Sequence, residues 1–335
     1  MASENPPDRT VDGVLLLNLG GPEKLGDVRP FLYNLFSDPD IIRIGNDTLR
    51  KLLAWFIATV RQGKSRGLYR QIGGGSPLRR ITDGQADALK ANLESKGYRV
   101  GVYVGMRCWN PTIDDAVAEI RRDGIERLVV LPLFPQYSVT TTGSCFNYLR
   151  SLASRTNLAR STQLLYVEDW FDVPLYIESM ADLIRQAQER FAGGAPRTVR
   201  LLYSAHSIPE RYVTEGDPYL EQTRATVGLI DARLGNELTS TLAFQSKVGP
   251  VKWLGPPTDK VIAAMGKQGV EKLLVVPVSF VSDHIETLQE IDILYRRLAL
   301  DSGTREFQRA ASLNLYPKFI EALAGVVVSR LQAVS

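Results

Sequence analysis

Apolar, β-branched runs alternate with segments of helical periodicity along almost the whole chain. The apolar runs predict eight strands, at residues 13–20, 99–106, 127–134, 163–167, 199–205, 242–246, 272–280 and 307–313. The helical segments lie at 27–37, 48–62, 82–96, 112–123, 143–154, 174–191, 218–233, 257–268, 284–300 and 316–333. Strands without polar alternation, joined by helices, are typical of parallel sheets that are covered on both faces through right-handed crossovers. The pattern therefore predicts an α/β fold.

A short internal repeat indicates two lobes. Residues 124–133 read Gly-Ile-Glu-Arg-Leu-Val-Val-Leu-Pro-Leu, and 269–278 read Gly-Val-Glu-Lys-Leu-Leu-Val-Val-Pro-Val, so five of the ten positions are identical. The helix–strand–helix context repeats as well. We therefore predict two similar doubly wound α/β lobes, 12–168 and 169–314, with a helix at 315–335 that packs back on the first lobe. Their strand ends would face one inter-lobe cleft, a common place for a ligand.

Composition narrows the class of protein. The chain has 335 residues, of which 44% are hydrophobic and 23% charged, which is enough for two domains. A net charge of +3, without any recognisable nucleic-acid motif, argues against a nucleic-acid partner. The two cysteines, Cys108 and Cys145, favour a reducing compartment. Residues 1–10 lack the apolar run of a signal peptide, and no run is long enough to cross a bilayer, so we expect a cytoplasmic protein.

The chain has only two histidines, and both stand where a buried strand pattern gives way to a polar turn. His206 ends the run at 199–205, and His284 follows the run at 272–280. In open α/β sheets, ligands bind beyond the carboxyl ends of the strands, and imidazole suits both proton transfer and metal binding. A single histidine at a strand end is more often structural, but the fact that both histidines of the chain lie at strand ends favours a functional site.

Three acids accompany His284. Asp283, Glu286 and Glu290 are spaced i, i+3 and i+7, which predicts that they share one face of a helix. Such a cluster would hold a hard or borderline cation, or relay protons. The alternative is helix capping, in which Glu286 closes a capping box, but this leaves Glu290 unexplained.

Two further segments suggest a ligand. The run from Leu52 to Val60 contains Trp55 and has basic residues on both sides, so it could lie in a membrane interface or form a core helix. The Gly-Gly-Gly-Ser-Pro loop at 73–77 could cradle an anion or form a simple turn, and it lacks the ending of a P-loop. Arginines and a tyrosine around it suit a large, flat, partly apolar ligand that bears carboxylates.

Seven motifs, in this order, resemble the ferrochelatase family. They are Leu-Leu-Asn-Leu-Gly-Gly-Pro at 16–22, Ile-Gly-Gly-Gly-Ser-Pro at 72–77, Phe-Pro-Gln-Tyr-Ser at 134–138, Ser-Ala-His-Ser-Ile-Pro at 204–209, Gly-Asp-Pro-Tyr at 216–219, Gln-Ser-Lys-Val-Gly-Pro at 245–250, and Val-Ser-Phe-Val-Ser-Asp-His-Ile-Glu-Thr-Leu at 278–288. The resemblance implies a chelatase-like fold of two Rossmann-like lobes, and insertion of Fe2+ into protoporphyrin IX to give protohaem. A tetrapyrrole- or metal-binding protein without chemistry stays open, as does a chelatase for Co2+ or for another tetrapyrrole such as coproporphyrin.

The resemblance also assigns roles to residues. It implies that His206 and Glu286 form the catalytic pair, as iron ligands or proton acceptors. The residues that match porphyrin contacts and pocket walls are Arg61, Tyr69, Ser76, Arg107 and Tyr137. A polar track for protons or metal would comprise Asp283, His284 and Glu290. The lip of the pocket would span 49–80, and its apolar part at 49–60 faces the membrane in some members.

Two departures from the family pattern bear on the site. The family usually has Tyr at the position of Cys108 and His at that of Asn110, so Cys108 could be a soft metal contact. The chain carries no cysteine-rich C-terminal extension of the kind that holds a [2Fe–2S] cluster in some members. We therefore expect no such cluster and no required cofactor, with Fe2+ as a substrate.

Overall fold

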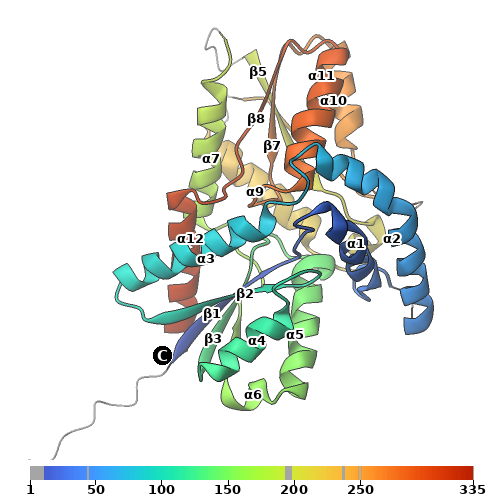
Figure 1. Ribbon diagram of the computed structural model, residues 1–335. Helices are drawn as coiled ribbons and strands as arrows, with labels where there is room; N and C mark the ends of the chain where they lie inside the picture. The colour runs from blue at the N-terminus through green and yellow to red at the C-terminus, as the bar shows by residue number, and fades with distance from the viewer. Residues whose placement is uncertain are drawn as a thin grey trace, which may run out of the picture.

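The computed structural model describes residues 11–334, apart from 44, 193–197, 236–237, 248 and 250. The expectation about a leader peptide at 1–10 lies outside these residues, as do two positions of the motif at 245–250. Two four-stranded parallel sheets form the framework (Figure 1). The first has the order β2-β1-β3-β4, with β1 (Asp12–Asn18), β2 (Val100–Met106), β3 (Arg127–Pro132) and β4 (Gln163–Tyr166). The second has the order β6-β5-β7-β8, with β5 (Val199–His206), β6 (Ser240–Gln245), β7 (Lys272–Pro277) and β8 (Glu306–Arg309). All eight predicted strands and the α/β fold class are confirmed.

Helices cover both sheets. Those before β5 are α1 (Val28–Ser37), α2 (Asp47–Arg70), α3 (Leu78–Ser95), α4 (Ile113–Arg122), α5 (Ser144–Arg155), α6 (Leu158–Ser161) and α7 (Pro174–Gln188). Those after β5 are α8 (Glu210–Thr214), α9 (Tyr219–Arg233), α10 (Thr258–Lys267), α11 (Arg296–Asp301) and α12 (Pro317–Gln332). The described residues also include the 3-10 helix η1 (Leu25–Asp27) and the π-helices η2 (Val139–Gly143) and η4 (Glu286–Tyr295). The short helices α6 and α8 were not predicted, because four or five residues carry no periodic signal.

The strands are apolar at successive positions because both of their faces are buried, as β1 illustrates. In β1, Val14 and Leu16 belong to the core shared with α3, α7 and α12, whereas Leu15 and Leu17 pack with α4 and α5 on the other face. All four side chains are fully buried. Because successive strand residues point to opposite faces, a strand that is covered on both faces must be apolar at every position.

The two sheets have the same topology and the same register. The Leu133 amide donates to the Leu17 carbonyl, and the Val278 amide donates to the Ser204 carbonyl in the second sheet. Pro132 and Pro277, which occupy the same place in the sequence repeat, pair with Leu17 and Ser204 respectively. Because Ser204 corresponds to Leu17, His206 in the second lobe corresponds to Leu19 in the first.

The lobes contact each other at several points near their strand ends. Gln136 donates to Thr226 at 3.1 Å, Ser138 donates to Asp217 at 2.9 Å, and Gln85 on α3 donates to Ser282 at 3.0 Å. Helix α12 lies against α3 and β3 as well as α7 (Figure 1). The C-terminal helix therefore touches elements of both halves of the chain.

Candidate active site

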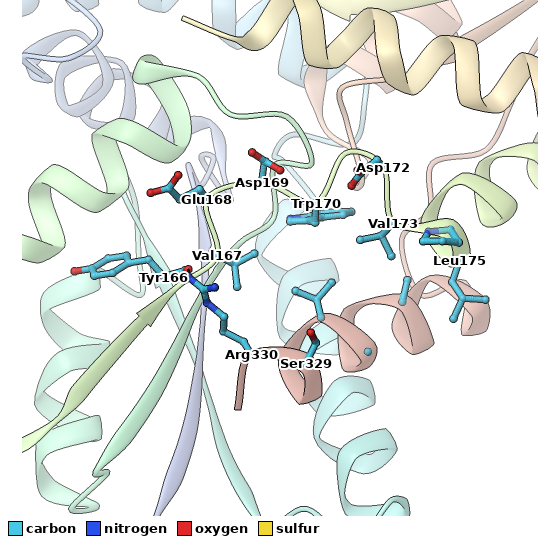
Figure 2. A pocket seen from close by; sticks show the side chains of 14 residues that line it. Tyr166, Val167, Glu168, Asp169, Trp170, Asp172, Val173, Leu175, Ser329 and Arg330 are labelled. Carbon is cyan, nitrogen blue, oxygen red and sulfur yellow. Dashed lines mark hydrogen bonds between the residues drawn. The ribbon is translucent and has the colours of Figure 1, made fainter. Parts of the chain in front are cut away.

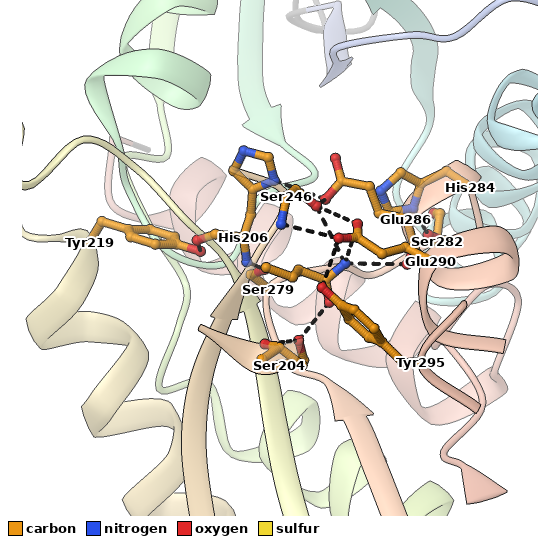
Figure 3. Close-up of polar contacts among 12 residues, drawn as sticks. Ser204, His206, Tyr219, Ser246, Ser279, Ser282, His284, Glu286, Glu290 and Tyr295 are labelled. Atoms are coloured by element: carbon orange, nitrogen blue, oxygen red, sulfur yellow. Dashed lines mark hydrogen bonds and ion pairs between the residues drawn. The ribbon is translucent and has the colours of Figure 1, made fainter. Parts of the chain in front are cut away.

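His206 and Glu286 lie side by side at the carboxyl edge of the second sheet (Figure 3). His206 is the last residue of β5, Glu286 is the first of η4, and their Nδ1 and Oε2 atoms are 2.8 Å apart. The backbone of His206 is fixed on both sides, because its amide donates to Ser279 Oγ at 2.8 Å and its carbonyl accepts from Tyr219 Oη at 2.8 Å. Glu286 therefore meets a histidine rather than closing a capping box.

The negative charge of Glu286 determines the tautomer of neutral His206 and shifts its pKa. A carboxylate only accepts hydrogen bonds, so in the neutral imidazole Nδ1 carries the proton and Nε2 keeps its lone pair. Burial alone would lower the pKa of His206, but the Glu286 carboxylate raises it above its usual value. Burial would likewise raise the pKa of Glu286, yet His206 holds that pKa well below its usual range. The His206 side chain remains 38% exposed, so part of the imidazole is open to a substrate.

A polar network extends from Glu286 to Glu290 (Figure 3). Ser246 Oγ lies 2.7 Å from Glu286 Oε2 and 2.6 Å from Glu290 Oε2. Glu290 also accepts from Gln245 Nε2 at 3.0 Å and from Tyr295 Oη at 2.8 Å. Burial and the neighbouring Glu286 charge raise the pKa of Glu290. Sequence reasoning missed Ser246 and Tyr295, although Ser246 lies in the motif at 245–250.

The other two members of the expected track have different surroundings. His284 donates from Nδ1 to the Ser282 carbonyl at 3.0 Å and stacks at a tilt on Phe280, with ring centroids 4.6 Å apart. Burial lowers the pKa of His284. Asp283 faces Arg309, whose Nη1 is 3.1 Å away. The prediction that Asp283 shares a helical face with Glu286 and Glu290 is wrong, because the helix begins only after Asp283.

Helix α2 and the loop after it carry three of the expected porphyrin contacts. The Arg61 guanidinium lies 5.8 Å from the Phe36 ring centroid, and Tyr69 is buried near the other end of the helix. Burial and the charge of Glu286 raise the pKa of Tyr69, and Ile285 of the second lobe packs against the same apolar cluster as Tyr69. Ser76 donates its amide to the Pro22 carbonyl at 2.7 Å. A side chain at Gly75 would lie 2.0 Å from the Glu23 carbonyl oxygen, so close packing explains a glycine there.

The two residues expected to form the pocket wall are Arg107 and Tyr137. Arg107 is held by contacts within the first lobe, and Tyr137 by a contact with the second lobe. Arg107 binds Asp38 at 3.0 Å and Ser144 at 3.0 Å. The Tyr137 amide donates to Gln222 Oε1 at 2.7 Å, which ties its loop to α9.

Both cysteines are free and buried. Cys108 packs among apolar side chains that include Tyr69, and burial raises the pKa of its thiol to about 12. A protonated thiol is a poor metal ligand, so this environment argues against the soft metal contact that the sequence suggested.

Iron would have few protein ligands here. Within the described part of the chain, no group of three or more His, Cys, Asp or Glu side chains is placed to hold a metal ion. That arrangement differs from the closed donor sets of structural metal sites.

The segment at 49–60 forms the exposed first half of α2. Its side chains of Leu49, Leu52, Trp55, Phe56 and Val60 are 53–65% exposed. A core helix would bury these residues, so the core alternative is wrong for this face. Among the residues that the structure describes, no helix combines the length and apolar character needed to span a bilayer.

A groove of about 590 Å³ lies elsewhere, between the segment after β4 and helix α12 (Figure 2). The acidic residues Glu168, Asp169 and Asp172 line it, together with apolar residues that include Val173 and Val326. None of the expected site residues lines it.

Comparison with known proteins identifies the family of the chain. The model of the ferrochelatase family matches residues 11–331. A ferrochelatase of Synechococcus sp. (strain JA-3-3Ab) is 54% identical over 317 residues, which cover 94% of this chain and 92% of that protein. A ferrochelatase of Gloeothece citriformis (strain PCC 7424) is 50% identical over 320 residues, covering 95% and 82%. SirB from Bacillus subtilis, solved with Fe3+, covers 96% of both chains with a TM-score of 0.56 and 12% identity, which shows the fold alone. The chain therefore belongs to the ferrochelatase family.

Proposed function

We propose that this protein inserts Fe2+ into protoporphyrin IX to form protohaem, with release of two protons. The observation that carries the proposal is the His206–Glu286 pair, held at 2.8 Å on an accessible strand edge within a member of the ferrochelatase family. Fe2+ is a substrate in this reaction, and the proposal requires no resident cofactor. Related proteins that bear the family name support the same reaction.

Metallation has two chemical requirements. A desolvated Fe2+ must reach one face of the ring, and two pyrrole protons must leave. Because the free macrocycle is flat with its N–H groups pointing inward, the site must favour a puckered form, which costs about 1–5 kcal/mol drawn from remote contacts. Arg61, Tyr69 and Ser76 would supply such contacts, with Arg107 and Tyr137 shaping the wall.

His206 and Glu286 act at the centre of the ring. Neutral His206 offers Nε2 as a base or ligand, while Glu286 fixes the Nδ1–H tautomer and attracts the cation. Ser246 connects Glu286 to Glu290, so protons can move away from the ring along this line. His284 borders the same site through Phe280.

We further propose that the protein acts in the cytoplasm and touches the membrane peripherally through 49–60. The exposed aromatic and aliphatic side chains on α2, with basic residues at both ends of the run, suit the headgroup boundary. Haem is poorly soluble in water, so a lip that rests on lipid would shorten its transfer.

The reaction can be tested directly. Purified protein is mixed with Fe2+ and protoporphyrin IX without oxygen, and haem is followed by its absorbance against a control without protein. Parallel reactions use Co2+ and coproporphyrin. Haem formation no faster than in the control would refute the proposed enzymatic activity and favour a binding protein. A clear preference for Co2+ or coproporphyrin would mean that the protein acts on a different substrate.

A further inference from the structure

Arg309 joins two separate parts of the segment that carries Glu286 and Glu290. It is the last residue of β8, and its guanidinium contacts two carboxylates. Nη1 lies 3.1 Å from Asp283, while Nε and Nη2 bind Asp292 at 3.0 and 2.9 Å. Asp283 precedes the π-helix η4, and Asp292 lies in its second half. The two acids therefore bracket both glutamates in the sequence.

The contacts of Arg309 are mostly shielded from water. Its side chain is 11% exposed, and those of Asp283 and Asp292 are 18% and 28% exposed. A planar guanidinium can bind one carboxylate with a two-pronged fork and keep further donors for a second, which a lysine cannot do. Arg309 thus has the geometry of a clamp rather than that of a surface ion pair.

Asp283 is unsuited to carry protons in this arrangement. Its carboxylate also accepts from Thr287 at 2.9 Å, Ser312 at 2.8 Å and Asn314 at 2.8 Å. Burial alone would raise its pKa, but Arg309 and these donors lower it below its usual value. To take up a proton, Asp283 would have to give up contacts that fix the start of η4.

The clamp matters because η4 is a π-helix. The wide i→i+5 pattern of a π-helix is rare and is frequent at functional sites. It aligns Glu290 with Tyr295, five residues on, and their side chains are hydrogen-bonded at 2.8 Å. In an α-helix the neighbours would be three and four residues apart, and this contact would be lost. The directions of Glu286 and Glu290 therefore depend on the wide turn.

We propose that Arg309 is a positioning residue for metallation: by binding Asp283 and Asp292 at once, it holds η4 so that Glu286 meets His206 and Glu290 meets Ser246. Asp283 belongs to this clamp and not to the proton track. The kinetic test of this inference rests on the proposed function, because it measures metallation.

Arg309→Met tests the clamp, and Arg127→Met is its matched control. Arg127 also binds a carboxylate with two prongs, at 2.7 and 2.9 Å from Asp12, but it opens β3 at the edge opposite the site. We expect Arg309→Met to lower kcat about tenfold or more, with the KM for porphyrin changed less than about twofold. Arg127→Met should lose stability and keep kcat. Arg309→Lys, which keeps the charge without the fork, should fall between wild type and Arg309→Met.

A second readout is independent of turnover. With 15N-labelled histidine the protein has two imidazole rings, each with two ring-nitrogen signals, and His206→Ala assigns the pair of His206. Arg309→Met should move the His206 signals in the same direction as Glu286→Gln, and Arg127→Met should leave them in place. Folded Arg309→Met with wild-type kcat and unmoved His206 signals would overturn the proposal. If that variant does not fold, the same result for Arg309→Lys overturns it. An inactive wild type refutes the proposed function, whereas the spectrum still decides on the clamp.

Discussion

The hydroxyl of Ser246 lies 2.6 Å from Glu290 and also contacts Glu286 at 2.7 Å, although it has a single proton to donate. If Ser246 donates to one carboxylate, the other contact is favourable only when that second carboxyl is itself protonated. Burial and the Glu286 charge raise the pKa of Glu290, whereas His206 lowers the pKa of Glu286, so a proton shared by the two carboxyls favours Glu290. When Glu290 is ionised, a proton that reaches Glu286 can therefore pass to it, because Ser246 gives its own hydroxyl proton to Glu290 and takes up the proton of Glu286.

Removing this hydroxyl should slow turnover. Ser246→Ala leaves Glu286 and His206 in place but interrupts the line to Glu290, so kcat should fall about tenfold with little change in the KM for porphyrin. Ser161→Ala, on the surface helix α6, is the control. Steady-state kinetics on both variants check this, and an unchanged kcat for Ser246→Ala would rule out the route through the hydroxyl.

His206→Ala should abolish metallation while porphyrin still binds. In the proposed mechanism, affinity comes from the pocket walls and arginines, whereas His206 would act at the pyrrole nitrogens or the metal. Glu286→Gln keeps the shape of the side chain and removes its charge, so kcat should also fall strongly. Porphyrin fluorescence quenching measures binding beside the turnover assay. A variant that keeps more than about a tenth of wild-type kcat, a loss below about 1.4 kcal/mol, would show that its residue is not catalytic.

The pH dependence should report the same pair. In the proposed mechanism metallation needs neutral His206, so activity should be lost as the pH falls through its pKa, which Glu286 raises above the usual value. Glu286→Gln removes the negative charge that stabilises the imidazolium, so the acid limb of kcat/KM should move to lower pH even as the rate drops. A limb that stays in place, or moves to higher pH, would mean that another group governs it.

Membrane contact should depend on α2. Trp55 and Phe56 are 53% and 59% exposed, so replacing both with serine should weaken binding to anionic vesicles, most clearly at low salt. Leu229→Ser with Leu300→Ser is the control, because these leucines are also exposed but lie on helices after β5. Co-sedimentation measures the bound fraction. Equal partitioning of wild type and the α2 variant would remove the basis for a lipid-facing lip.

The sequence predicts the fold well because each strand is buried on both faces. The run through Leu15 and Leu16 has no other simple explanation, and the repeated strand at 124–133 and 269–278 fixes the two-lobe plan. His206 and Glu286 were identified from their places at strand ends together with the family motifs. The structure adds the distance between their side chains, which places them in hydrogen-bond contact.

The remaining features depend on tertiary contacts that no local pattern carries. Arg309 binds Asp292 and Asp283 across 17 and more residues, and an arginine at the end of a strand gives no sign of its partners. The predicted helix at 284–300 is partly a π-helix, since ten residues of apolar spacing do not separate a wide turn from an ordinary one. Asp283 was misplaced because the helix begins only after it, and the apolar spacing does not mark that boundary.

The equivalence of the two sheets has a consequence for the faces of the substrate. The position that His206 occupies in the second lobe is held in the first by Leu19, a hydrocarbon side chain beside Cys108 and Tyr69. A flat macrocycle lying between the two strand ends would meet an imidazole on one side and an aliphatic wall on the other. Proton removal would then be confined to a single side of the ring, and the opposite lobe would serve as the surface against which the ring is bent.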